Sequence, residues 1–175
     1  MNTQQAKTYE NYPLWIPALS WSVAISIDLL GAYILYRLMA VLPVFYLLFV
    51  LWLEYKLLKY HCVQCYYCGK TCGLGKGKLA AAIFRKADPP RLRERQVGWR
   101  DLITDFMVLI LPVAAGTIYL LRKFDPVILA LLVLLVLLCL GGNSFVRRNL
   151  VCKYCKQKQL GCPAEHFFNG TRCCP

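Results

Sequence analysis

Four long apolar stretches dominate the sequence and limit what it can fold into. They run from Trp15 to Leu38, Pro43 to Leu58, Leu102 to Leu121 and Pro126 to Phe145. About 20 helical residues cross the roughly 30 Å of hydrocarbon in a bilayer, and each stretch reaches or approaches this length. The 175-residue chain is also 58% hydrophobic, which is rare in a soluble domain of this size. The sequence therefore predicts an all-α integral membrane protein with four transmembrane helices, and a soluble helical bundle is the alternative.

The segment before the first apolar stretch, MNTQQAKTYENYP, is polar and nearly neutral. A secretory signal instead has a basic start, a short apolar core and a small-residue cleavage site. We therefore expect the first span to remain in the mature protein.

The links between the stretches differ in length and charge, which predicts sidedness. RLMAVLP and RKFDP are so short that both must be tight turns on one face, and together they carry three Lys and Arg residues. Residues 59–100 carry ten Lys and Arg residues, and the tail 146–175 carries six. These two segments share the other face of the membrane with the N-terminus. Basic segments stay in the cytoplasm during insertion. We expect both termini and both cysteine-rich segments there, where thiols stay reduced and disulfides are disfavoured.

The net charge of +12 predicts a partner as well as a topology. Basic residues next to a membrane are attracted to anionic lipid headgroups, with about 1 kcal/mol for each nearby charge. No nucleic-acid-binding motif accompanies the charge. The expected partner is therefore a bilayer with anionic headgroups, not nucleic acid.

An internal duplication is indicated by the pattern C-x2-C-x6-C, which occurs twice at an offset of 90 residues. The matching cysteines are Cys62, Cys65 and Cys72 in the first copy and Cys152, Cys155 and Cys162 in the second. GAYILYR (31–37) resembles GTIYLLR (116–122), and a proline follows each of them. Each copy holds two spans, so the copies share one orientation and are related by an axis along the membrane normal. We expect residues 1–100 and 101–175 to be two hairpin copies in one compact membrane domain, with their cysteines close together.

The first cysteine stretch, Cys62-x2-Cys65-x2-Cys68-x3-Cys72, resembles the run that binds iron–sulfur clusters in bacterial ferredoxins. The resemblance covers eleven residues and ends at Gly73, where ferredoxins have proline. It implies one or two 4Fe-4S clusters and a role in electron transfer.

The second copy has Lys158 where the first has Cys68, so only three cysteines are common to both copies. The fourth ligand would be Cys68 in the first copy and Cys173 or Cys174 in the second. His61 or a bound partner are further alternatives.

Zinc is the main alternative to iron–sulfur clusters. Two Cys-x-x-Cys pairs, one from each copy, would supply the four thiolates of a closed structural zinc site. Such a site would join the hairpins in a non-redox scaffold or small transporter. A second alternative is a thiol-redox protein, because nearby lysines lower the pKa of a Cys-x-x-Cys thiol.

Outside the cysteines, Asp28 is the residue that most suggests function. It falls near the middle of the first apolar stretch, where an acid is costly and by default marks an ion, proton or quinone site. A structural role, accepting hydrogen bonds from a neighbouring helix, is an equal alternative. GLGKGK (73–78) fails the nucleotide-binding pattern, because Leu79 replaces the Ser or Thr that binds magnesium. We expect a flexible turn there, with lysines that reach lipid phosphates.

No catalytic triad or carboxylate pair is recognisable, so the sequence favours a non-catalytic subunit or electron carrier over a stand-alone enzyme. The function that it predicts is an iron–sulfur electron-transfer or anchor subunit of a membrane redox complex. Other subunits of that complex, and a quinone, are the expected partners.

Overall fold

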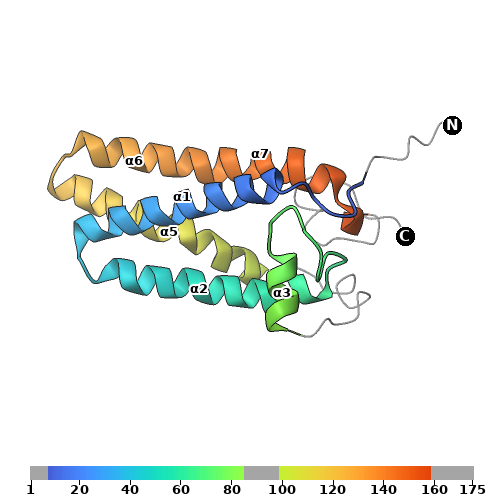
Figure 1. Ribbon diagram of the computed structural model, residues 1–175. Coiled ribbons are helices and arrows are strands. Elements are labelled where there is room, and N and C mark those ends of the chain that lie inside the picture. Colours follow the sequence, from blue (N-terminus) through green and yellow to red (C-terminus); the bar gives the residue numbers. More distant parts are fainter. Residues whose placement is uncertain (1–7, 85–98, 159–175) are drawn as a thin grey trace. The chain divides into compact units, whose positions relative to one another are not determined.

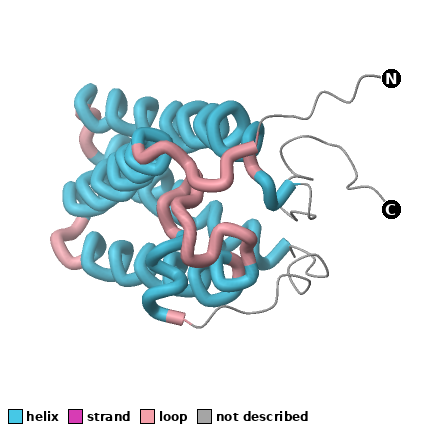
Figure 2. The backbone as a smooth tube through the Cα atoms, turned by 45° about the vertical axis from the view of Figure 1, so that its right-hand side comes forward, coloured by secondary structure: helices cyan, strands magenta, loops and turns pink. Residues whose placement is uncertain are grey.

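The computed structural model describes residues 8–84 and 99–158, without the side chains of residues 99–102, 105 and 158. Within these ranges the chain is helical, joined by turns and loops, and contains no strand (Figures 1 and 2). The described residues divide into two compact units. Residues 22–56 and 99–144 form the helical unit, and residues 8–21, 57–84 and 145–158 form the cysteine-rich unit. Each unit therefore takes segments from both of the predicted copies.

All four apolar stretches are helical, and the predicted bounds need only small corrections. The helices are α1 (Trp15–Leu38), α2 (Leu42–Tyr60), α5 (Trp99–Arg122) and α6 (Pro126–Val136). The fourth apolar stretch, Pro126–Phe145, is helical throughout: α6 is followed by η2 (Leu137–Gly142) and α7 (Asn143–Phe145), and helical backbone continues beyond the stretch through η3 (Val146–Val151). Both η2 and η3 are π-helical turns. A further short helix, α3 (Gly77–Ile83), begins within the glycine-rich stretch GLGKGK (73–78).

In the described part of the chain, two helices are long and apolar enough to cross a membrane. They are Trp15–Leu38, with 24 residues, and Pro126–Tyr154, with 29 residues. Helix α2 is shorter and carries Glu54, Lys56 and Lys59 near its end, and the apolar part of α5 is restricted to Phe106–Arg122.

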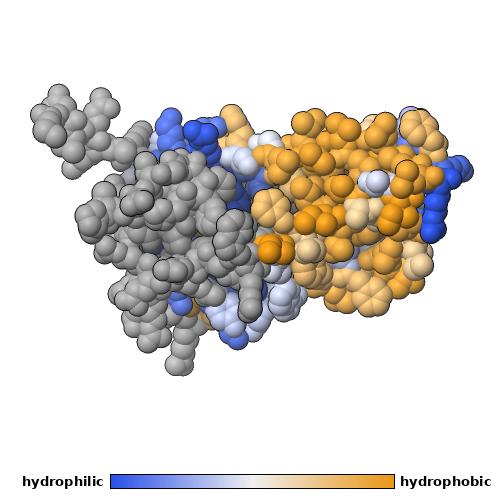
Figure 3. Space-filling view, turned by 180° about the vertical axis from the view of Figure 1, so that it is seen from behind, coloured by the Kyte–Doolittle hydropathy of each residue, from blue (hydrophilic) through white to orange (hydrophobic). Residues whose placement is uncertain are grey.

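Large apolar side chains cover the outside of the helical unit, as its visible face in Figure 3 shows. Leu29 of α1, Leu51 of α2 and Leu137 of η2 are each more than 60% exposed. Only 22% and 17% of the residues are buried in an apolar 18-residue window of each candidate span, whereas a core helix of a soluble protein is mostly buried. Exposing such a surface to water costs about 25 cal/mol per Å². The surface therefore favours a lipid environment over the soluble bundle.

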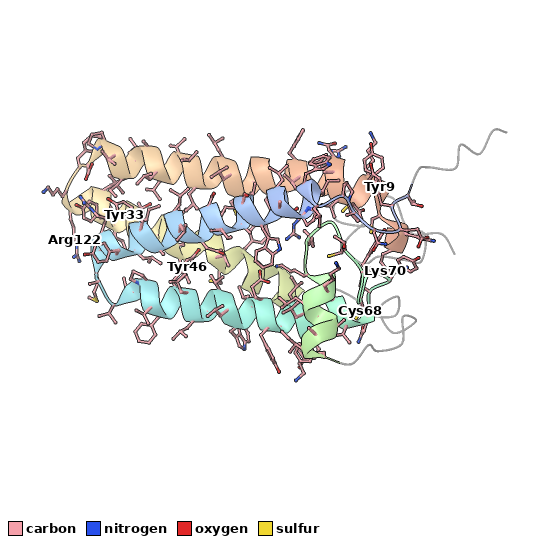
Figure 4. The ribbon with its side chains drawn as sticks, viewed as in Figure 1. Tyr9, Tyr33, Tyr46, Cys68, Lys70 and Arg122 are labelled. Atoms are coloured by element: carbon pink, nitrogen blue, oxygen red, sulfur yellow. The ribbon has the colours of Figure 1, made fainter. Side chains whose placement is uncertain are left out.

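A proline in α5 explains why α1, α2 and α5 pack closely. Pro112 has no N–H, so the Val108 carbonyl four residues earlier loses its helical partner. The Tyr46 hydroxyl of α2 donates a hydrogen bond to this carbonyl at 3.2 Å. Gly31 of α1 makes room for the tyrosine, since a Cβ atom on Gly31 would lie 2.6 Å from the Tyr46 hydroxyl oxygen. Tyr46 lies midway along the unit (Figure 4).

The second hairpin uses its equivalent glycine in a similar way. A Cβ atom on Gly116 of α5 would lie 2.8 Å from a Leu132 methyl group of α6. Small residues allow helices to approach closely in membranes, where packing replaces the hydrophobic driving force. The two glycines that match in sequence, Gly31 and Gly116, thus occupy matching places between the helices of their hairpins.

The two interhelical turns lie at the same end of the helical unit, as their lengths predicted. Arg37, at the end of α1, bonds to the Asp125 carboxylate of the α5–α6 turn at 3.1 Å. The same guanidinium donates to the Tyr119 hydroxyl at 3.3 Å. Asp125 also caps α6 by accepting the Val127 N–H at 2.9 Å. This contact links the first hairpin to the second.

The bond between Tyr46 and Val108 generates a test of the bundle. We expect Tyr46→Phe to lower the free energy of unfolding in detergent by about 1 kcal/mol, because the Val108 carbonyl is left unpaired. The same substitution made in a Pro112→Ala background should cost less, because the alanine returns a backbone N–H to that carbonyl. Denaturant titration of the four proteins measures the coupling, and strictly additive losses would contradict the interpretation.

Candidate metal centre

The two Cys-x-x-Cys sequences fold into the same turn. Cys62–Gln64 (η1) and Cys152–Tyr154 (η4) are each one 3₁₀ turn, and Cys65 and Cys155 follow in extended conformation. The second cysteine of each pair has φ −79° and ψ 149° in the first copy, and φ −80° and ψ 121° in the second. In both turns its N–H donates to the carbonyl of the first cysteine at 3.3 Å. The repeated sequence pattern therefore has a repeated local structure.

Direct hydrogen bonds hold the two cysteine stretches against each other. The hydroxyl of Tyr67, which lies between Cys65 and Cys68, accepts the Lys156 N–H at 3.0 Å. It donates to the Tyr9 carbonyl at 2.6 Å, and Tyr67 is only 2% exposed. The Tyr66 N–H donates to the Gln157 side-chain oxygen at 2.7 Å, and Gln157 is also buried. The contact between the copies that the duplication predicted thus depends on side chains that sequence reasoning missed.

Residues 9–12 of the N-terminal segment bind to both stretches. The Tyr9 N–H donates to the Tyr154 carbonyl at 3.1 Å, and the Tyr12 N–H donates to the Thr71 carbonyl at 3.0 Å. The Tyr12 hydroxyl donates to the Val151 carbonyl at 2.6 Å. This segment, which the sequence presented only as a polar leader, is a structural part of the cysteine-rich unit. The closely spaced tyrosines of YENY were the available signal.

Glu10 adds a charged contact to the same segment. Its carboxylate binds Lys156, Lys70 and the Tyr66 hydroxyl, with the Lys70 nitrogen at 3.4 Å (Lys70 and Tyr9 are labelled in Figure 4). The hydrogen bonds from Lys156, Tyr66 and Lys70 lower the pKa of Glu10 to about 2. The contact is therefore complete above the ordinary carboxyl pKa of 4.5 and weakens as the pH falls toward 2. Because the group is exposed, its contribution to stability is modest.

No disulfide joins the cysteines within residues 8–84 and 99–158. Burial raises the pKa of Cys65 to about 12, and the neighbouring Cys155, Cys72 and Cys62 contribute to the increase. Sulfur atoms of both copies therefore act on Cys65, which is a neutral thiol at neutral pH. Soft sulfur donors of this kind match zinc or an iron–sulfur cluster, and a bound metal would displace the thiol protons.

Those predicted ligands that the structure describes are nevertheless not arranged as a closed coordination site. Within residues 8–84 and 99–158, no three or more His, Cys, Asp or Glu side chains are grouped to hold a metal ion. Of the eight predicted ligands, Cys162 and Cys173 lie outside the described residues. Cys68, labelled in Figure 4, is buried next to Tyr67 in the chain, and Cys72 is half-buried.

Cys72 has a distinct environment, built by the glycine-rich turn that follows it. Its sulfur accepts the backbone N–H groups of Lys76 and Gly77, each at 3.2 Å. Side chains from the start of α1 hold the turn from outside. The Ser20 hydroxyl donates to the Gly73 carbonyl at 3.0 Å, and the Trp21 indole donates to the Leu74 carbonyl at 3.0 Å.

The glycines of this turn are required by its geometry. Gly75 has φ +73°, in the left-handed region that side chains disfavour. A Cβ atom on Gly77 would collide with the backbone carbonyl oxygens of Tyr67 and Lys70. Glycine is thus needed at two positions of the expected turn, and the backbone of the turn binds a sulfur atom.

Asp28 belongs to the helical unit, whereas the cysteines above belong to the cysteine-rich unit. It lies half-buried on α1, close enough to Tyr46 for an electrostatic interaction. The predicted site residues therefore fall into two separate groups.

Comparison of the chain with protein-family models, with curated proteins and with solved structures finds no match. A function must therefore be argued from the chemistry of these residues.

The two hydrogen bonds of Tyr67 generate a test of the contact between the copies. We expect Tyr67→Phe to lower the free energy of unfolding by about 2 kcal/mol, because a partly buried N–H and a partly buried carbonyl lose their shared partner. Tyr66→Phe is the matched control, since its hydroxyl contacts the charged side chains of Glu10 and Lys70, which can turn to water, and its loss should cost less than about 0.5 kcal/mol. Equal losses in the two variants, measured by denaturant titration in detergent, would show that Tyr67 does not link the stretches.

Proposed function

We propose that the protein is a four-span integral membrane protein, built from two duplicated hairpins, that binds metal through its cysteine-rich unit. The exposed apolar surface of the helical unit supports the membrane location. The duplication is supported by the matching positions of Gly31 and Gly116 and by the matching turns at Cys62–Gln64 and Cys152–Tyr154.

The cysteine-rich unit faces the cytoplasm in this proposal. The Arg37–Asp125 contact joins the two short, weakly basic turns at one end of the helical unit. The strongly basic segments 59–100 and 146–175 then follow the other ends of the helices, on the side where positive charge is retained. Their lysines and arginines bind anionic headgroups.

The observation that carries the metal proposal is the pair of matching Cys-x-x-Cys turns held together by Tyr67. A Cys-x-x-Cys turn directs two sulfur atoms to one side, and two such turns would supply the four thiolates of a metal centre once they closed on the ion. The burial of Cys65 and the N–H···S bonds to Cys72 are further features of thiolate–metal sites.

Our first candidate is one or two 4Fe-4S clusters in an electron-transfer or anchor subunit of a membrane redox complex. The ferredoxin-like spacing from Cys62 to Cys72 favours clusters, because it uses more of the cysteines than one zinc ion would. N–H···S bonds such as those to Cys72 tune cluster potentials. Asp28 would serve a quinone or proton in the bilayer, and other subunits would exchange the electrons.

Zinc is the second candidate, and the symmetry of the two turns favours it. Two cysteines from each copy would close a tetrahedral site that joins the hairpins without redox chemistry. The protein would then be a scaffold or a small transporter.

Anaerobic purification, followed by metal analysis and visible spectroscopy, tests the metal proposal and separates the candidates. Clusters give a broad visible absorption that bleaches with dithionite, whereas zinc is colourless. We expect Cys65→Ser and Cys155→Ser to lose the metal and Cys139→Ser, a cysteine of the helical unit, to retain it. Native protein that is properly folded but free of metal would refute the proposal and favour thiol-redox chemistry.

The topology has its own test, which uses a membrane-impermeant thiol reagent on intact cells. Lys123 lies exposed in the second short turn, so Lys123→Cys should be labelled from outside. The wild-type protein should be labelled only after the cells are opened, because its cytoplasmic cysteines are shielded by the membrane. Labelling of the wild type on intact cells would reverse the proposed orientation.

A further inference from the structure

Helix α3 (Gly77–Ile83) turns an apolar face outward from the cysteine-rich unit. Its inner side is formed by Gly77 and Ala80, which are both buried. Leu79 and Ile83, on the other side, are 41% and 56% exposed. Residues four apart lie on the same face of an α-helix, so these two side chains form one apolar surface. The described part of the chain leaves that surface exposed.

The turn before α3 is bonded to α1 at the point where that helix leaves the cysteine-rich unit. The Trp21 indole N–H donates to the Leu74 carbonyl at 3.0 Å, and the Ser20 hydroxyl donates to the Gly73 carbonyl at 3.0 Å. Trp21 is the last residue of α1 in this unit, and the helical unit begins at the next residue. Tryptophan is enriched where a helix crosses the membrane–water interface. Because the helical unit is the proposed membrane-spanning part, α3 begins near the level of the lipid headgroups.

The direction of α3 suits the same location. Figure 1 shows α3 running across the direction of the last turn of α2, not alongside it. Since α2 is one of the proposed spans, a helix in this direction lies along the membrane surface. Lys78 is exposed next to Leu79, and its long aliphatic stem lets the ammonium reach lipid phosphates while the apolar side chains stay deeper. Apolar side chains below the headgroups with a cation among them are typical of interfacial helices.

We propose that α3 is an interfacial helix in the cytoplasmic surface of the bilayer, with Leu79 and Ile83 at the acyl-chain boundary and Lys78 among anionic headgroups. The occupant of the apolar face is lipid, not a second copy of the chain. This inference rests on the proposed membrane location. It adds that the cysteine-rich unit is anchored to the bilayer surface through α3 as well as through the spans.

A short diazirine-bearing amino acid, placed at one position at a time, identifies what covers α3. The full chain is reconstituted in vesicles of phosphatidylcholine and phosphatidylglycerol and irradiated, and its adducts are identified by mass spectrometry. We expect lipid adducts when the diazirine side chain replaces Ile83 or Leu79. Few are expected when it replaces Lys153, an exposed charged position of the second cysteine turn. Leu51 of α2, which is more than 60% exposed in the helical unit, is the positive control.

The controls separate failure of this inference from failure of the proposed function. Lipid adducts at Leu51 but not at Ile83 or Leu79 would overturn the inference and leave the membrane location intact. Crosslinked dimers at Ile83 in place of lipid adducts would also overturn it, because a second copy would then cover the face. Equal lipid yields at Ile83 and Lys153 would show that the contact is not specific to α3. Absence of lipid adducts at Leu51 would instead refute the proposed membrane location itself.

Hydrogen exchange gives a second test that needs no crosslinker. A seven-residue helix is marginal by itself, so the protection of its backbone amides depends on what its faces pack against. In the same vesicles, Leu79→Ala combined with Ile83→Ala should raise the exchange rates of the α3 amides about tenfold, because the apolar anchors are lost. Alanine favours the helix, so lower helix propensity would not explain the increase. The amides of residues 152–155 should exchange as before, and unchanged rates in α3 would contradict the inference.

Discussion

The cysteine-rich unit depends on one buried phenol. The Tyr67 hydroxyl accepts a backbone N–H from the second cysteine stretch and donates to a carbonyl of the N-terminal segment. A buried hydroxyl that both accepts and donates a hydrogen bond stabilises the fold. It also fixes the positions of its two partners, because neither can move away without leaving a polar group unpaired. Three segments that are far apart in sequence are thereby fixed around one atom. The proximity of the two Cys-x-x-Cys turns, and with it the metal proposal, follows from this arrangement.

The two halves of the chain share their framework and differ in their details. Both hairpins place a glycine where two helices approach, and both lead into a 3₁₀ turn that presents two cysteines. The first half has the glycine-rich turn around Cys72, whose sequence the second half lacks, and its Arg37 pairs with the partner hairpin.

Much of the fold could be predicted from hydropathy and turn length. The bounds of α1 are those predicted, and the common end of the two turns follows from their shortness. The residues that join the segments could not be predicted, because their partners are distant in sequence. Tyr67 and Gln157 look like ordinary loop residues until the fold brings them together. Tyr46 is similar, since its role depends on a proline in another helix.

The sequence predicts which residues belong to the candidate site, but it does not predict the contacts that hold them in place. The cysteine spacing identifies sulfur ligands and a repeated pattern, because both can be recognised in short stretches of the sequence. It does not reveal that GLGKGK directs its N–H groups at Cys72, because glycine-rich sequences suit flexible turns and fixed ones equally. Cysteine spacing also does not show that Asp28 belongs to the helical unit while the predicted metal ligands of the described ranges belong to the cysteine-rich unit.

The π-helical turns at the end of the fourth helix have a consequence for the alignment of the two copies. From Pro126 to Cys152 the chain advances 26 positions, whereas from Leu42 to Cys62 it advances 20. In a regular α-helix each residue turns the chain by about 100°, so six extra residues would rotate the next segment by about 240°. Wider turns hold more residues per revolution and reduce that rotation. The two π-helical turns therefore offset part of the rotation that the six extra residues would otherwise add before the second cysteine turn.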